Sequence, residues 1–324
     1  MAPTIGVDIG GTKILGVAVD TSSPGGSLMA EVRRPTPRGG KAIVGAIVEV
    51  VRAATREAGA VDVDAVGVGL PGLVDRIGVL RSGPNLPGVV DLDVEGPLRA
   101  ALGGPVVVSE NDANCAAWAE RERGACRGVS DAVVVTLGTG IGAGVIAGGE
   151  LFRGAHGMAG EAGHMIVDPR GPRCPCGRRG CWERYASGSG LGFLAREAAV
   201  AGRAEAVVAL AGGDPEAVRG EHVTAAARSG DAGALAVIDE FGWWVALGLA
   251  NLVNVFDPEL VVVGGGLVAE GDLLLAPTRD AFGTLVLGAG HRPPVPIVAA
   301  EMGERSGAAG AALLAAKALR GHGG

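Results

Sequence analysis

Residues 4–19 read TIGVDIGGTKILGVAV. An apolar run reaches Asp8, a glycine turn follows, and a second apolar run begins at Ile14. The order strand, glycine turn, strand predicts a β-hairpin and excludes the strand-to-helix entry of a Rossmann or Walker loop. Such a turn offers a phosphate close backbone approach, N–H donors and a lysine charge, and Asp8 is suited to hold Mg²⁺ through water. The turn consists of Gly10, Gly11, Thr12 and Lys13.

The same pattern recurs in the middle of the chain. Residues 131–137 form an apolar strand, the turn GTGIGAG follows at 138–144, and another strand begins at Val145. Two such hairpins imply two similar lobes. A third glycine turn follows the apolar strand at 260–263, where an adenosine would be clamped. Each turn taken alone is weak evidence, because most glycine turns are ordinary tight turns, but three in this order indicate a nucleotide site. The candidate residues are Gly138, Thr139, Gly140, Gly264, Gly265 and Gly266.

A carboxylate follows another buried strand. Residues 106–108 are apolar and run into Ser-Glu-Asn-Asp at 109–112, after which a helix is expected through about residue 122. Phosphoryl transfer to a hydroxyl needs a carboxylate that orients and deprotonates it, and α/β folds bind ligands at the carboxyl ends of strands. Asp112 is therefore the candidate base. Helix capping is the alternative, because Asn111 and Asp112 both suit an N-cap, and the spacing alone leaves both open.

Residues 160–183 read GEAGHMIVDPRGPRCPCGRRGCWE. The stretch supplies one imidazole and three thiols, which is a complete tetrahedral set for a structural zinc ion. The alternative is a disulfide between two of the cysteines. Zinc would close the loop and bring Glu161 and Glu183 close to His164, whose second ring nitrogen would then donate a hydrogen bond. The predicted metal ligands are His164, Cys174, Cys176 and Cys181.

Composition narrows the class of protein. The chain of 324 residues is 48% hydrophobic but only 3% aromatic, so Val, Leu, Ile and Ala must build its core. The net charge is −7 and there is no basic run, so nucleic acid is not an expected partner. No signal peptide is visible, and no uninterrupted apolar run reaches the roughly 18 residues of a membrane span. With three of the cysteines assigned to metal, a reducing, cytoplasmic location is expected.

The glycine–histidine pair followed by CxCGxxGCxE resembles the zinc motif of the ROK family of sugar kinases and repressors. The three glycine turns are similar to those of the actin-like ATPase superfamily. The resemblance implies an α/β, two-lobed actin-like (ribonuclease H-like) fold with a structural zinc segment. The lobes would comprise residues 1–112 with 305–324, and residues 113–304, with the substrate in a cleft. It also implies the cofactors ATP, Mg²⁺ and zinc, and a homo-oligomer, either a dimer or a tetramer.

The resemblance also implies roles for individual residues. Glu-Asn-Asp before a helix looks like the catalytic segment of the family, so Asn111 would bind sugar and Asp112 would be the base. Glu161, His164 and Glu183 match the sugar-binding positions. Asn85, in the stretch GPNLPG, matches a substrate loop, although a turn residue is equally expected before Leu-Pro.

The expected activity is ATP-dependent phosphorylation of glucose to glucose 6-phosphate, since the stretch GCWERYASG at 180–188 looks most like the glucokinases of this family. N-acetylglucosamine, N-acetylmannosamine, mannose and fructose are alternative substrates, and polyphosphate is an alternative donor. Repressors of this family carry a DNA-binding segment ahead of the first hairpin. The hairpin of this sequence starts at residue 4, so a sugar-responsive repressor is disfavoured. A chaperone-like ATPase is disfavoured by the zinc stretch.

Overall fold

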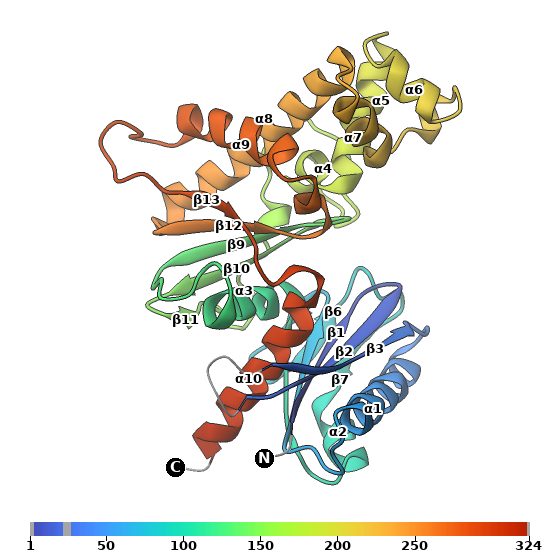
Figure 1. Cartoon of the computed structure of the whole chain (residues 1–324), viewed down its shortest axis with the longest axis vertical. Helices are drawn as coiled ribbons and strands as arrows, with labels where there is room; N and C mark the ends of the chain where they lie inside the picture. Colours follow the sequence, from blue (N-terminus) through green and yellow to red (C-terminus); the bar gives the residue numbers. More distant parts are fainter. Residues whose placement is uncertain (1–2, 22–26, 323–324) are drawn as a thin grey trace. The chain divides into compact units, whose positions relative to one another are not determined.

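The computed structural model describes residues 3–21 and 27–322, which form two compact units (Figure 1). The first unit comprises Met1–Val134, Gly144–Gly160 and Glu301–Gly324, and the second comprises Val135–Ala143 and Glu161–Ala300. These bounds differ from the lobes expected from the sequence, the first of which ended at residue 112. The helix after that residue, α3 (Asp112–Arg123), lies in the first unit because it packs against the last helix, α10 (Ser306–His322).

A five-stranded sheet forms the centre of the first unit, in the order β3-β2-β1-β4-β8. Its strands are β1 (Thr4–Ile9), β2 (Lys13–Val19), β3 (Leu28–Pro35), β4 (Ala65–Leu70) and β8 (Val106–Asn111). β1 and β2 are antiparallel and confirm the predicted hairpin, whereas β1, β4 and β8 are parallel to one another. The carboxyl ends of these three strands therefore lie at one edge of the sheet.

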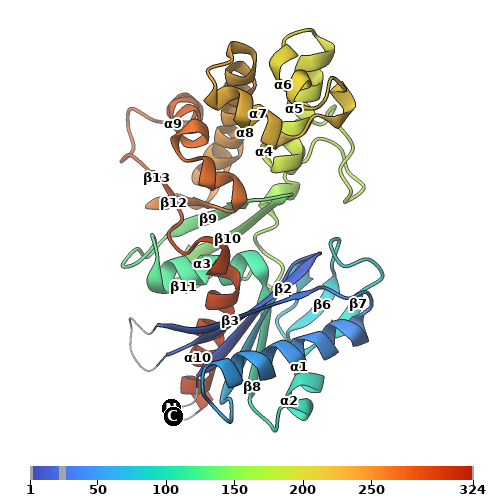
Figure 2. The same cartoon turned by 45° about the vertical axis from the view of Figure 1, so that its right-hand side comes forward.

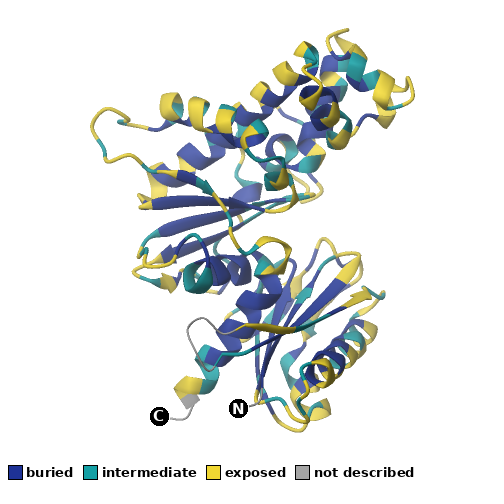
Figure 3. Cartoon of the chain, viewed as in Figure 1, coloured by how far each residue is buried: buried dark blue, intermediate teal, exposed yellow. Residues whose placement is uncertain are grey.

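Helices cover both faces of this sheet, with α1 (Gly40–Glu57) on one face and α10 on the other (Figures 1 and 2). Alternate side chains of a strand point to opposite faces, and β1, β2 and β4 are buried on both, whereas the edge strand β3 is largely exposed (Figure 3). α10 approaches the sheet at two glycines. A Cβ at Gly6 or at Gly67 would lie 1.8 Å from the carbonyl oxygen of Ala308 or of Ala311, respectively. Any larger residue at these positions would push the helix off the sheet.

The other elements of the first unit are short. They are β5 (Leu73–Val74), β6 (Val79–Ser82), β7 (Val90–Asp93), β11 (Glu150–Leu151), α2 (Glu95–Ala101) and the 3₁₀ turn η4 (Gly303–Arg305). β5, β6 and β7 form a separate three-stranded sheet. None of these elements was predicted, because each is too short for a periodic pattern of hydrophobic residues to stand out.

A second five-stranded sheet has the order β11-β10-β9-β12-β13. Its longer strands are β9 (Ala132–Leu137), β10 (Ile141–Ala147), β12 (Leu260–Gly264) and β13 (Ile297–Ala299). β9 and β10 are neighbours joined by the second predicted glycine turn. The chain passes from the first unit to the second within β9 and returns within β10.

The second unit is otherwise helical. Its helices are α4 (Glu183–Ala186), α5 (Gly188–Val200), α6 (Glu205–Leu210), α7 (Gly220–Arg228), α8 (Ala232–Phe256) and α9 (Asp272–Leu285), with 3₁₀ turns η1 (Ala162–His164), η2 (Pro215–Ala217) and η3 (Gly266–Glu270). α9, which contains Pro277, and β13 were not predicted.

α8 is long and apolar enough to cross a membrane by length and composition alone. Half of its most apolar segment is buried inside the protein. Gly248 of this helix lies against the buried ring of Trp182, where a Cβ would meet ring carbons at 1.9–2.4 Å. One such helix is weak evidence for a membrane span, because the core helix of a globular unit has the same composition.

Candidate functional site

Two of the predicted acidic residues lie together at the carboxyl edge of the first sheet. Asp8 is opposite Gly69 in the register of β1 and β4, and Asn111 at the end of β8 is opposite Leu70. A Cβ at Gly69 would lie 3.4 Å from Oδ1 of Asp8 and 3.6 Å from Cα of Asp112. The structure therefore brings Asp8 and Asp112 to opposite sides of a residue that has no side chain.

The carboxyl group of Asp8 has a raised pKa. Burial raises the pKa of its carboxyl group to about 6, and the positive charge of Lys13 acts in the opposite direction. The Lys13 Nζ lies 3.4 Å from Oε2 of Glu304, in a pair whose side chains are 53% and 66% exposed. Exposed ion pairs contribute little free energy, so Glu304 is an easily replaced partner of Lys13.

The first glycine turn is closed by a hydrogen bond from the backbone N–H of Gly10 to the carbonyl oxygen of Lys13, at 2.8 Å. The predicted substrate loop lies directly against this turn. A Cβ at Gly11 would come within 3.0 Å of the carbonyl oxygen of Asn85 and 3.6 Å of its Cβ. The sequence did not indicate that Asn85 and the first glycine turn are neighbours, since more than seventy residues separate them.

The structure separates the roles of Asn111 and Asp112 at the start of α3. Asn111 is the N-cap, and its Oδ1 accepts a hydrogen bond from the N–H of Asn114 at 3.0 Å. Its Nδ2 donates to the carbonyl oxygen of Gly72 at 3.1 Å. Asp112 is the first helical residue, with Oδ1 2.9 Å from the N–H of Ala113. The capping alternative therefore applies to Asn111, and helix α3 does not depend on Asp112 for its cap.

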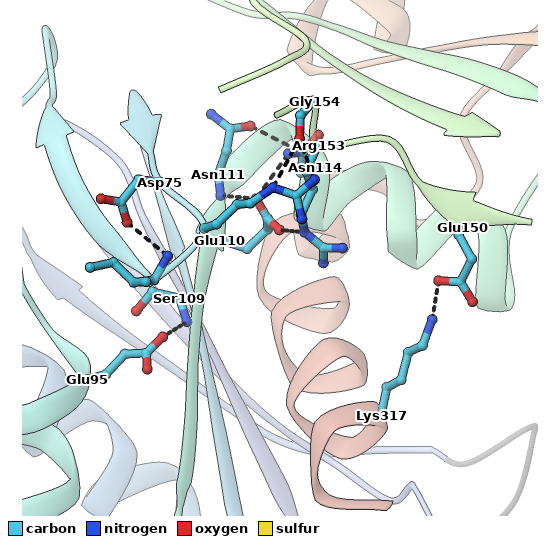
Figure 4. A network of polar contacts seen from close by, with 12 residues as sticks. Asp75, Glu95, Ser109, Glu110, Asn111, Asn114, Glu150, Arg153, Gly154 and Lys317 are labelled. Atoms are coloured by element: carbon cyan, nitrogen blue, oxygen red, sulfur yellow. Dashed lines mark hydrogen bonds and ion pairs between the residues drawn. The ribbon is translucent and has the colours of Figure 1, made fainter. Parts of the chain in front are cut away.

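An ion pair between Arg153 and the buried Glu110 supports this turn (Figure 4). Oε1 of Glu110 accepts hydrogen bonds from the N–H of Asn111 at 2.9 Å and from Nδ2 of Asn114 at 3.0 Å, while Oε2 pairs with Nε of Arg153. The Glu110 side chain is only 7% exposed. Sequence analysis missed both members of this pair, and the available signal was a carboxylate at the end of an otherwise apolar strand.

The second unit contains the predicted metal cluster. The donor atoms of the four predicted ligands all lie within 4.8 Å of one another. Sγ of Cys176 is 3.5 Å from Sγ of Cys181, and Sγ of Cys174 is 3.8 Å from Nδ1 of His164. Zinc–sulfur bonds of about 2.3 Å in a tetrahedron place the ligands about 3.8 Å apart, so the donor set fits zinc. All three cysteines are free thiols in the structure, as a zinc site requires.

Two glutamates flank this cluster as the sequence predicted. Oε2 of Glu161 lies 4.0 Å from Nε2 of His164, and Oε1 of Glu183 lies 3.7 Å from Nδ1 and 3.0 Å from Sγ of Cys174. Burial raises the pKa of Glu161; the charge of His164 opposes this rise and that of Glu183 adds to it. Glu183 also reaches the second glycine turn, where a Cβ at Gly140 would lie 2.9 Å from its Oε2.

A cavity of about 630 Å³ lies in the second unit beside that turn. Gly138 and Thr139 line it, together with Gly188 and Ser189 at the start of α5. The N–H of Gly188 donates to the carbonyl oxygen of Gly138 at 2.8 Å, and Oγ of Ser189 donates to that of Thr139 at 3.0 Å. These bonds hold the amino-terminal end of a helix against the glycine turn, an arrangement suited to an anion.

The third glycine turn contributes to the same cavity only in part. Gly266 lines it, whereas Gly265 packs against β9, where a Cβ would lie 2.4 Å from the carbonyl oxygen of Leu137. Gly264 also packs inward, near Ala300. Charged and hydroxyl side chains that the sequence analysis did not single out complete the lining, namely Arg196, Arg219, Glu221, Thr224 and Glu270. The cavity thus combines a glycine turn and the amino-terminal end of a helix with a polar wall.

Comparison with known proteins agrees with this architecture. Residues 4–318 match the model of the ROK family. The chain is 42% identical over 318 residues to a glucokinase of Streptomyces coelicolor, covering 97% of this chain and 98% of that protein.

Two solved structures are similar along nearly their whole length. A ROK family glucokinase from Streptomyces griseus, in complex with glucose and AMPPNP, has a TM-score of 0.85 and 40% identity, with 97% of this chain and 99% of that chain covered. A ROK hexokinase from Thermus thermophilus has a TM-score of 0.78 and 36% identity, with 98% and 99% covered. The sequence match, the actin-like fold and the Cys/His cluster agree, and the chain belongs to the ROK family.

Proposed function

We propose that this protein is an ATP-dependent glucokinase. In the reaction, the 6-hydroxyl oxygen of glucose forms a bond to the γ-phosphorus of ATP, the bond from that phosphorus to the bridging oxygen breaks, and ADP leaves. The observation that carries the proposal is the placement of Asp8 and Asp112 on either side of Gly69, next to a glycine turn, in a chain similar to a glucokinase solved with glucose and AMPPNP.

Asp112 is the proposed general base. It accepts the proton of the 6-hydroxyl as that oxygen attacks, which is the task of a carboxylate in phosphoryl transfer. Its position at a strand end supports this role, and so does the assignment of the helix cap to Asn111 rather than to Asp112.

The proposed donor site has a phosphate part and a nucleoside part. The turn at residues 10–13 and its lysine would bind phosphate oxygens, and Asp8 would hold the Mg²⁺ of Mg–ATP through water. When bound, Mg²⁺ offsets negative charge on the phosphates. In the second unit, Gly138 and Thr139 would contact phosphate, Gly140 belongs to the same turn, and the adjoining cavity would hold the nucleoside. Gly266 lies in the wall of that cavity, with Gly264 and Gly265 supporting it from behind.

Two groups of residues are proposed as sugar ligands. Asn85 and Asn111 of the first unit would bind hydroxyls near the reacting carbon. Glu161, His164 and Glu183 of the second unit would bind hydroxyls elsewhere on the ring. Their grouping around one imidazole supports this, because two carboxylate acceptors and one ring N–H form a polar surface matched to a polyhydroxylated pyranose.

A structural zinc ion is proposed for the cluster of His164, Cys174, Cys176 and Cys181. Nδ1 of His164 faces the thiols, so this nitrogen would be the ligand, and Nε2 would keep its proton beside Glu161. The zinc ion would hold the loop closed and fix the imidazole tautomer. We further propose a cytoplasmic homo-oligomer, a dimer or a tetramer, without nucleic-acid or membrane partners.

A panel of sugars tests the proposal. Glucose, mannose, glucosamine, N-acetylglucosamine and N-acetylmannosamine are supplied at matched concentrations with Mg–ATP, and ADP release is measured. Glucose should be preferred by at least about tenfold in kcat/KM, a difference of about 1.4 kcal/mol. A parallel series with polyphosphate in place of ATP tests the donor.

The outcomes separate the alternatives. Preference for an N-acetylated sugar would overturn glucose as the substrate and leave the kinase intact. Binding of sugar without any ADP release, under conditions where the fold is intact, would favour a regulator. The Asp112→Asn protein serves as the blank for contaminating kinases.

A further inference from the structure

One residue outside the predicted motifs holds two carbonyl groups of the first phosphate turn. Thr36 Oγ1 donates a hydrogen bond to the carbonyl oxygen of Gly10 at 2.7 Å. Its backbone N–H donates to the carbonyl oxygen of Thr12 at 3.0 Å. Thr36 directly follows β3, so a residue after the third strand is bonded to the turn between the first two.

These two bonds determine which way the turn presents its N–H groups. In a trans peptide the C=O and N–H of one unit point in opposite directions, and the described residues contain no cis peptide. The Gly10 carbonyl shares its peptide unit with the N–H of Gly11, and the Thr12 carbonyl shares its unit with the N–H of Lys13. Because both carbonyls point toward Thr36, both N–H groups point away from it. The backbone N–H of a glycine turn, here that of Gly11, is the kind of donor that phosphate oxygens require.

The segment that makes these bonds is stiff before any ligand arrives. Pro35 and Pro37 flank Thr36, and a proline ring restricts its own φ and the conformation of the residue before it. Pro35 is also opposite Lys13 in the register of β2 and β3. The turn is thus held by a preorganised segment, which lowers the entropic cost of ordering it around a ligand.

We infer that Thr36 is a positioning residue for the phosphoryl donor: its hydroxyl holds the Gly10–Gly11 peptide so that the N–H of Gly11 faces a phosphate oxygen. Thr36 itself touches no substrate in this arrangement. Its effect should therefore fall on the donor and spare the sugar. The inference deepens the proposed kinase function and rests on it.

Paired variants isolate the hydroxyl. Thr36→Val keeps the shape of the side chain and the backbone N–H but removes the hydroxyl, and Thr36→Ser keeps the hydroxyl and removes a methyl group. Thr55→Val is the matched control in the same unit, because Oγ1 of Thr55 donates to the carbonyl oxygen of Val51 at 2.8 Å, within α1. Mg–ATP binding to each folded protein is measured by calorimetry without sugar, and KM for ATP and for glucose is measured separately.

Loss of one neutral hydrogen bond should weaken Mg–ATP binding, and raise KM for ATP, by about 3- to 10-fold in Thr36→Val. KM for glucose should stay unchanged, and Thr36→Ser and Thr55→Val should resemble the parent protein. If Thr36→Val does not fold, Thr36→Ala is measured in its place, because it removes the hydroxyl without adding a buried methyl group.

Three results would overturn the inference. They are unchanged ATP affinity in Thr36→Val, equal damage to ATP and glucose, and a Thr36→Ser protein as impaired as Thr36→Val. Failure of the proposed kinase function would look different from these three results, because the parent protein would then phosphorylate no sugar. The comparison of Mg–ATP binding between Thr36→Val and the parent protein would still decide the role of Thr36.

Discussion

The carboxylate of Asp8 lies directly over Gly307, in the first turn of α10. A Cβ at Gly307 would come within 2.8 Å of the carboxyl carbon and within 2.9 Å and 3.0 Å of its two oxygens. The position of the Asp8 carboxylate, near the end of the first strand, thus depends on Gly307, almost three hundred positions later in the chain. A side chain at position 307 would occupy the space of the Asp8 carboxylate.

Gly307→Ala should therefore displace Asp8 and damage ATP use while the fold persists. Misplacement of a reacting group by about 1 Å can cost about 100-fold, so kcat with Mg–ATP should fall by roughly 10- to 100-fold. Gly321→Ala is the control in the same helix, because a Cβ there meets nothing within 4 Å. Steady-state kinetics that do not distinguish the two variants would contradict the dependence of Asp8 on Gly307.

The raised pKa of Asp8 predicts a pH-dependent stability. The folded protein keeps the proton of the Asp8 carboxyl group up to about pH 6, whereas the unfolded chain releases it near pH 3.8. Protonation of Asp8 therefore stabilises the fold fully below pH 3.8, and this contribution to the free energy of unfolding is lost as the pH rises to about 6. Asp8→Asn removes the buried charge. In buffer without Mg²⁺ or nucleotide, its Tm should exceed that of the parent protein at pH 8 and approach it at pH 5. The same Tm difference at both pH values would show that the Asp8 carboxyl group is not perturbed.

Asp112→Asn should keep the fold and the binding of sugar and lose phosphoryl transfer. The cap of α3 belongs to Asn111, so the substitution leaves that cap in place. Loss of a general base lowers turnover by about 10²–10⁴-fold. Single-turnover assays measure the loss, and circular dichroism checks the helix content. Retention of a tenth of the parent turnover would exclude Asp112 as the base.

Arg153→Met should destabilise the first unit by about 3–5 kcal/mol, because it leaves the buried Glu110 carboxylate without a positive partner. Arg33→Met is the control, since Arg33 is 49% exposed and pairs with Glu31 at the surface, where about 0–1 kcal/mol is expected. Urea unfolding measures both. The double variant Glu110→Met, Arg153→Met should recover part of the loss, and a double variant less stable than Arg153→Met alone would refute the uncompensated charge as the cause.

The purified protein should contain about one zinc ion per chain. Cys176→Ser should lose the ion, and with it the position of Glu183, so affinity for sugar and stability should fall together. Cys126→Ser leaves the cluster intact and should retain full metal content. Metal analysis of protein prepared without chelators decides the matter, and a fully active enzyme free of zinc would refute the structural role.

Much of the candidate site could be predicted because its information is local in the chain. The zinc ligands lie within eighteen residues, and their spacing alone limits which donors can meet around one ion. The hairpin at residues 4–19 is likewise determined by two apolar runs and the turn between them. Short elements such as β5, β6 and β7 escaped prediction because too few residues carry their pattern.

The sequence by itself determined the family, the two glycine hairpins, the metal cluster and the candidate base, since each depends on residue types at close spacing. Only the tertiary structure decided which distant residues support them. It showed that Thr36 is hydrogen-bonded to the first glycine turn, that Arg153 pairs with Glu110, and that Gly307 leaves room for Asp8. The physical reason is that these contacts join separate strands and helices. The distance between the contacting residues along the chain does not indicate which elements pack together in the fold.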